Sequence, residues 1–83
     1  MKHASVATLR QIENLLASLR TLPGLKEKSA GAFYRGGSAF LHFHEDPAGL
    51  FADLKVDGDW TRRPVNSDTA RAKLLRDARR LLA

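Results

Sequence analysis

The 83-residue sequence contains no cysteine and no long apolar run. Without cysteine, a disulfide framework, a thiolate metal site and a thiol nucleophile are all excluded. No stretch approaches the ~18 apolar residues of a membrane-spanning helix, and the opening "MKHASVATLR" lacks the apolar run of a signal peptide. We therefore expect a cytoplasmic protein without a membrane partner. Its stability should come from packing alone or from packing plus self-association.

Acidic residues are scarce at the end of the chain. The net charge is +5, yet residues 1–59 carry seven basic and seven acidic residues, which cancel. Residues 60–83 carry seven basic residues against only Asp68 and Asp77. Such asymmetry favours an anionic partner such as nucleic acid, although a solvated basic helix face would give the same pattern.

With 43% hydrophobic and 28% charged residues, the composition is that of a folded chain, and its length suits one domain, residues 1–83. Apolar residues recur at helical spacing near both ends, which predicts two amphipathic helices. The first covers about residues 5–22, with Ser5 as its N-cap. The second is the final segment "NSDTARAKLLRDARRLLA", capped by Asn66 or Ser67. The expected core contains Leu9, Ile12, Leu16, Leu19, Leu41, Phe43, Leu54, Leu74, Leu75, Ala78 and Leu81.

Between the helices the apolar period changes to two. The segments "AFYR" and "SAFLHFH" flank Gly36-Gly37, and "LFADLKV" and "DWTRRPV" flank Asp57-Gly58, which predicts two hairpins. A third turn is expected at residues 46–49. The predicted fold is α+β: a four-stranded antiparallel meander with an N-terminal and a C-terminal helix packed on one face (α-β-β-β-β-α). The preceding "LKEKSAG" is expected to be a polar loop.

Minimal turns place His42 opposite Asp53 and His44 opposite Phe51. A one-residue shift at the central turn would instead put Asp53 among aliphatic side chains, which the cost of a buried charge disfavours. The face expected to pack under the helices contains Ala32, Tyr34, Ala39, Leu41, Phe43, Leu50, Ala52, Leu54, Val56 and Val65. The face expected to lie opposite contains Phe33, Phe40, Phe51, Trp60, His42, His44, Asp53, Lys55 and Arg62.

The segment "FLHFHEDPAG" raises the question of a metal or acid–base site. A His-x-His strand points both imidazoles to one face, as a metal site on a sheet requires, and Asp53 is the candidate third ligand. His3 is expected to be remote. The hydrolytic alternative is a His42–Asp53 dyad, with Ser38 as the nearest hydroxyl. The commoner arrangement is a pair of sheet-surface histidines before a turn, so no catalytic residue and no cofactor is assigned.

Two surfaces could contact a polyanion. The aromatic sheet face could stack bases beside cations, unless it is core or a dimer contact. The basic arc of the final helix could contact phosphates, unless it is only solvated. No helix-turn-helix, zinc-finger, RNP or phosphate-loop motif supports a specific mode. The candidate nucleic-acid contacts are Arg62, Arg63, Lys73, Arg76, Arg79, Arg80, Trp60 and Phe40.

The segments "LPGLKEKSAG", "AFYRGGSAFLHF" and "GLFADLKV", followed by a late helix, occur in an order that resembles the MmcQ/YjbR-like group of small bacterial proteins. The resemblance covers about residues 9–60. It implies a frataxin-like α+β fold and the DNA-binding role suggested for that group, and it assigns no functional residue.

These patterns together predict a non-enzymatic module that binds nucleic acid or another polyanion. One alternative is a metal-binding or hydrolytic protein that uses His42, His44 and Asp53. The others are a homodimeric protein-interaction domain and a domain that regulates a separate protein partner.

Overall fold

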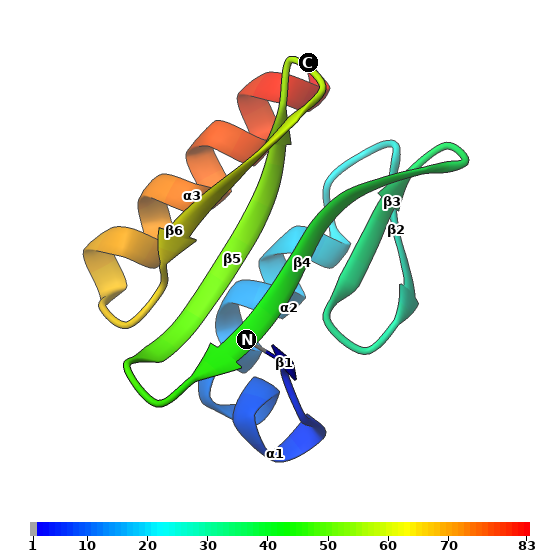
Figure 1. The fold of residues 1–83 in the computed structure, drawn as a ribbon. Helices are drawn as coiled ribbons and strands as arrows, with labels where there is room; N and C mark the ends of the chain where they lie inside the picture. Colours follow the sequence, from blue (N-terminus) through cyan, green and yellow to red (C-terminus); the bar gives the residue numbers. More distant parts are fainter. Residues whose placement is uncertain (1) are drawn as a thin grey trace.

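The computed structural model describes residues 2–83 as an antiparallel sheet covered on one side by helices (Figure 1). The elements follow in the order β1 (Lys2–His3), α1 (Val6–Leu9), the 3₁₀ turn η1 (Arg10–Ile12), α2 (Glu13–Arg20), β2 (Leu25–Ser29), β3 (Ala32–Arg35), β4 (Ser38–Asp46), β5 (Gly49–Val56), β6 (Asp59–Pro64) and α3 (Asp68–Leu82). The expected α+β class, with an antiparallel sheet and helices at both ends, is confirmed.

The sheet has more strands than the four expected. Its order is β2-β3-β4-β5-β6, and β1 pairs with β4 off this path. Strand β2 is formed by part of the "LKEKSAG" segment, so the expectation of a loop there is wrong. Only Leu25 of β2 is buried, because this strand lies at the sheet edge and leaves its other side chains partly or fully exposed. Its polar sequence therefore lacks the apolar alternation that reveals a strand.

The N-terminal helical region is interrupted rather than continuous. The Ser5 hydroxyl caps α1 by accepting from the Thr8 amide, as expected, but the 3₁₀ turn η1 separates α1 from α2. In a 3₁₀ turn, residues three apart eclipse one another. Leu9 and Ile12 thus remain on the buried side, in line with Leu16 and Leu19 further along.

A β-bulge corrects the faces expected for the β3–β4 hairpin. Tyr34 pairs with Ala39 as expected, but Phe33 pairs with Leu41, which leaves Phe40 as the extra residue. Phe33 and Phe40 are consequently buried in the core rather than on the opposite face. Ala32 and Tyr34 move in exchange to the face opposite the helices, where Ala32 pairs with His42.

Helix α3 closes the helical side of the sheet next to α2 (Figure 1). The Ser67 hydroxyl caps it by accepting from the Ala70 amide at 3.1 Å. Leu74 and Ala78 are fully buried, while Leu75 and Leu81 pack against the core and are partly buried. Every other member of the expected core is buried. Within residues 2–83, no helix has the length and apolar character needed to cross a membrane.

Candidate functional site

The β4–β5 hairpin sets the positions of the two strand histidines. Its register pairs His42 with Asp53, His44 with Phe51 and Asp46 with Gly49, which confirms the unshifted alignment. Asp46 stabilises the turn by accepting from the Ala48 amide at 2.9 Å. Because alternate strand residues point to opposite faces, both histidines lie on the face that the helices leave open.

His42, His44 and Asp53, here called the histidine cluster, bring two imidazoles and a carboxylate together. His44 Nε2 lies 3.0 Å from Asp53 Oδ2 and 3.4 Å from His42 Nδ1. One potential ligand atom from each residue lies within 4.8 Å of the others. This is the residue set that the sequence indicated for a metal site, and the fold does assemble it.

Arg62 on β6 is the partner of the Asp53 carboxylate. Its Nε donates to Oδ1 at 2.9 Å, and one terminal guanidinium nitrogen donates to Oδ2 at 3.1 Å. These hydrogen bonds outweigh the effect of burial and hold the pKa of Asp53 below its ordinary value. Asp53 is the only buried charged residue in the described chain, and it is ionised and oriented at neutral pH.

His42 lies between His44 and the indole of Trp60. Its ring centroid is 4.4 Å from that of Trp60 and 5.5 Å from that of His44. Burial, followed by the neighbouring His44, lowers the pKa of His42 despite the opposing attraction of Asp53. The imidazole of His42 is therefore neutral at pH 7, which leaves it a free lone pair.

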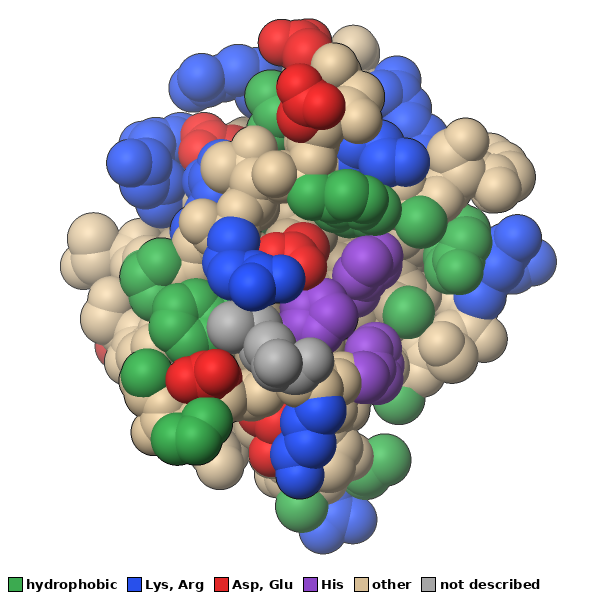
Figure 2. All heavy atoms as spheres, viewed as in Figure 1, with side chains coloured by type: hydrophobic (Ala, Val, Ile, Leu, Met, Phe, Trp, Pro, Cys, Tyr) green, Lys and Arg blue, Asp and Glu red, His purple; other side chains and the backbone are tan. Residues whose placement is uncertain are grey.

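The histidine cluster opens to solvent. A hollow of ≈ 400 Å³ is lined by the cluster together with Trp60 and Arg62. Figure 2 shows histidine side chains side by side on this face, next to acidic and basic side chains, and the chain has three histidines. The third is His3, which pairs with His44 through β1 and whose ring centroid lies 6.0 Å from that of His44. The expectation that His3 is remote is wrong, because β1 pairs with β4 and places His3 beside His44.

The aromatic surface on the open face is smaller than expected. The bulge buries Phe33 and Phe40, so the Phe40 ring is not available to stack on a base. Phe51 is half-buried, and Trp60 keeps 44% of its surface exposed. Tyr34, which the bulge moves to this face, is also only partly exposed, with Lys28 Nζ 4.7 Å from its ring centroid, so Trp60 is the most exposed aromatic residue of the face in the described chain.

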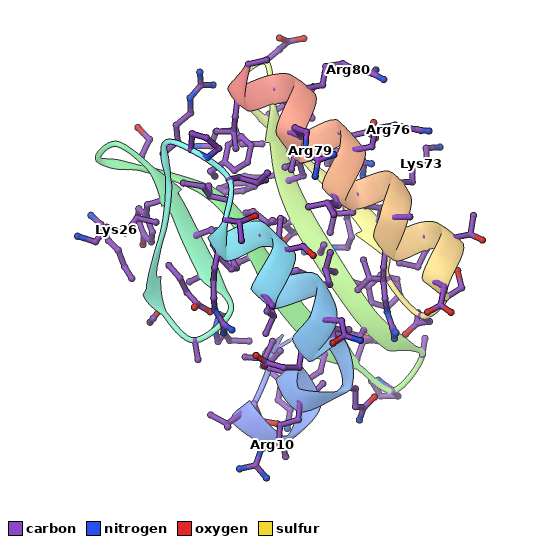
Figure 3. The ribbon with its side chains drawn as sticks, turned by 180° about the vertical axis from the view of Figure 1, so that it is seen from behind. Arg10, Lys26, Lys73, Arg76, Arg79 and Arg80 are labelled. Atoms are coloured by element: carbon purple, nitrogen blue, oxygen red, sulfur yellow. The ribbon has the colours of Figure 1, made fainter. Side chains whose placement is uncertain are left out.

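The exposed basic arc of α3 is present as expected. Figure 3 shows Lys73, Arg76, Arg79 and Arg80 along the side of the helix that points away from the sheet. All four are exposed. The closest acid contact among them in the described chain is that of Arg76 Nε, 3.7 Å from Asp77 Oδ1. We call these four residues the α3 basic face.

The two arginines of β6 have different surroundings. Arg63 points to the helical side and donates to Asp77 Oδ2 at 2.6 Å, which lowers the pKa of Asp77. Arg62 points to the open side and binds Asp53. The β5–β6 register accounts for both placements, since Leu54 pairs with Thr61 and Asp53 with Arg62. The sheet therefore separates the α3 basic face from Trp60 and Arg62, and these residues do not form one surface.

No family model, curated protein or solved structure matches the chain. The resemblance to the MmcQ/YjbR-like group therefore stays a prediction. Homodimer formation, nucleic-acid binding and a cytoplasmic location also stay predictions.

Proposed function

We propose that the protein binds nucleic acid through the α3 basic face, by contacts to backbone phosphates. The observation that carries this proposal is the concentration of four exposed cations on one side of a single helix, with little acidic charge to oppose them. The nearest carboxylate, Asp77, is already paired with Arg63. The surplus positive charge of the chain is thus presented outward on α3.

The spacing of these cations suits a duplex groove. Lys73, Arg76 and Arg80 follow one another by three and four residues, so they form one stripe along the helix. With a rise of about 1.5 Å per residue, the stripe is roughly 10 Å long. The major groove of B-DNA is about 12 Å wide, so flexible basic side chains from this stripe can reach phosphates on both sides of it.

Base stacking is not part of this binding mode. The exposed aromatic residue of the open face, Trp60, lies across the sheet from α3, and Phe40 is in the core. Phosphate contacts carry little sequence information. We therefore expect duplexes to bind at least as tightly as single strands of equal length, with weak sequence preference and no change in Trp60 fluorescence.

The test compares two variants of equal net charge by fluorescence anisotropy with a labelled duplex. Lys73→Gln/Arg80→Gln removes two cations from the stripe on the α3 basic face. Arg10→Gln/Lys26→Gln removes two exposed cations that lie away from that face (Figure 3). The slope of log affinity against log salt concentration is about −0.9 for each phosphate contact. The slope of the α3 variant should therefore be less steep than that of the wild-type protein by about two, while the control variant should keep the wild-type slope.

Equal losses in both variants would contradict the proposal, because net charge alone would then explain binding. Quenching of Trp60 by single strands would instead place the ligand on the open sheet face. Absence of binding at low salt would make the α3 basic face a solvated surface.

A further inference from the structure

We propose that the histidine cluster is a binding site for a divalent transition metal, with His42, His44 and Asp53 as its protein ligands. This inference is independent of nucleic-acid binding, because it concerns the opposite side of the sheet. Two imidazoles and one carboxylate form a ligand set used for Zn²⁺ and for non-haem Fe²⁺. The His-x-His spacing and the β4–β5 register bring all three onto one rigid surface.

Two of the three separations between the ligand atoms are near those of a tetrahedral ion. Ligands bound to zinc at about 2.0–2.1 Å in a tetrahedron lie roughly 3.3–3.4 Å from one another. His42 Nδ1 and His44 Nε2 are 3.4 Å apart, and His44 Nε2 and Asp53 Oδ2 are 3.0 Å apart. The remaining separation is no more than 4.8 Å, and a small rotation of the partly exposed His42 ring can close it.

The chain alone leaves the polar network of this site incomplete. His44 Nδ1 is the one buried side-chain nitrogen or oxygen among residues 2–83 that has no hydrogen-bond partner. Buried polar atoms nearly always have partners. An ion bound at Nε2 does not contact Nδ1, which lies across the imidazole ring, so the partner that Nδ1 requires is a water and not the metal.

Arg62 acts here as a positioning residue. Metal-bound carboxylates are commonly held by further hydrogen bonds that orient them. The 2.9 Å bond from Arg62 Nε fixes Asp53 Oδ1, so Oδ2 faces the histidines. With three protein ligands, the ion keeps an open position toward the ≈ 400 Å³ hollow, as catalytic zinc sites do.

The test is a titration of the protein with Zn²⁺ alone, measured by isothermal calorimetry. The protein must be freed of any affinity tag. We expect one bound ion per chain. His42→Ala, His44→Ala and Asp53→Asn should each lower the affinity by more than the ~10–100-fold that is typical when a residue hydrogen-bonded to a metal ligand is changed. Co²⁺, which is paramagnetic, should quench Trp60 because its ring centroid lies 4.4 Å from that of His42. Asp53→Asn preserves the side-chain shape, and a thermal melt without metal checks that each variant is folded.

His3→Gln is the matched control, since His3 lies on the same face. Its Nε2 already contacts the Ala30 carbonyl oxygen at 3.2 Å, so this variant should retain the wild-type Zn²⁺ affinity to within ~10-fold. Failure of the wild-type protein to bind Zn²⁺ overturns the inference. So does binding that survives His42→Ala and His44→Ala, or binding that only His3→Gln removes.

Discussion

Gly49 is the residue on which the register of the histidine cluster depends. Its φ of 134° lies in a region that side chains rarely adopt, and it pairs with Asp46 to close the β4–β5 turn. A Cβ at this position would meet the Asn66 side chain at 2.8 Å. Asn66 in turn accepts from the Leu50 amide at 2.9 Å, which links the turn to the segment before α3. A change at this one glycine therefore acts on the turn, the register and the helix entry together.

We expect Gly49→Ala to lower the free energy of unfolding by about 1–3 kcal/mol, the usual cost of a strained backbone conformation. Gly37→Ala is the control, because Gly37 lacks a positive φ and a Cβ there would meet nothing within 4 Å. Urea denaturation of the two variants and the wild-type protein measures the difference. A Gly49→Ala protein as stable as Gly37→Ala would show that the turn tolerates a side chain.

At the scale of elements, β2 is attached by charge as well as by strand pairing. Glu27 of β2 accepts from Arg20 Nε at 2.6 Å and from the Gly31 amide at 3.0 Å, so it connects the end of α2 with the β2–β3 turn. Burial alone would raise the pKa of Glu27, but these hydrogen bonds outweigh it and the pKa lies below its ordinary value. Arg20 also binds Glu13 at 2.8 Å, and Glu13 is more exposed than Glu27.

We expect Glu27→Gln to cost about 1 kcal/mol of stability at pH 7, a value reduced by the exposure of Arg20. Amide exchange in β2 should accelerate. Because the folded-state pKa of Glu27 is depressed, its stabilisation exists above the unfolded value of about 4.3 and disappears as the pH falls through the folded value. The difference between wild type and variant should therefore shrink in acid.

Glu13→Gln is the matched control for this change. It removes the same charge and the other contact of Arg20 without touching β2. Equal destabilisation by the two substitutions, or a difference that persists at low pH, would show that Glu27 does not hold β2 in place. Unfolding curves at several pH values, together with exchange rates for residues 25–29, provide both measurements.

Local signals in the sequence predicted some elements and could not predict others. Gly36-Gly37 and Asp57-Gly58 give hairpins because their backbone conformations, with φ of 61° at Gly36 and 52° and 87° at the second pair, follow from residue type. The pairing of His42 with Asp53 then follows by counting. Strand β2 recruits its polar residues through backbone pairing, and the bulge at Phe40 depends on core packing. Neither has a local signal, so the burial of Phe33 and Phe40 could not be predicted.

The same reason explains the missing members of the site. The pairing of His3 with His44 joins residues 41 positions apart, and no turn between them fixes the register. The Arg62–Asp53 pairing was within reach, because a two-residue turn connects β5 and β6. Long-range contacts that depend on a neighbouring hairpin are thus predictable, whereas those that depend on the final shape of the sheet edge are not.

At the scale of the whole molecule, the sheet divides the protein into two chemically different sides. The helical side carries the core and the α3 basic face, and the open side carries the histidines, Trp60 and Arg62. Strand β6 directs side chains to both sides of the sheet. On it, neighbouring residues point in opposite directions: Arg62 to Asp53 on one side, and Arg63 to Asp77 on the other. This pair therefore gives the two proposed sites one route of contact, alongside the packed core between β5 and α3.

We expect that communication to be weak, so that Zn²⁺ and nucleic acid bind independently. Metal binding at Asp53 can alter the Arg62 contact, but Arg63 remains paired with Asp77 because its side chain lies beyond the sheet. The two sites open to solvent on opposite sides of the sheet, and salt screens exposed charges from one another beyond about 8 Å at physiological ionic strength. Duplex affinity measured with and without saturating Zn²⁺ should differ by less than about twofold, and linkage requires the same factor for Zn²⁺ affinity.

The His44→Ala variant, measured in parallel, removes the metal site and identifies any direct effect of Zn²⁺ on the duplex. A tenfold change in the wild-type protein that is absent from this variant would contradict independence and implicate β6 as the connection. Arg63→Gln would then locate the coupling. If the change disappears in that variant, the Arg63–Asp77 pair transmits it; if it persists, the connection runs through the packed core between β5 and α3.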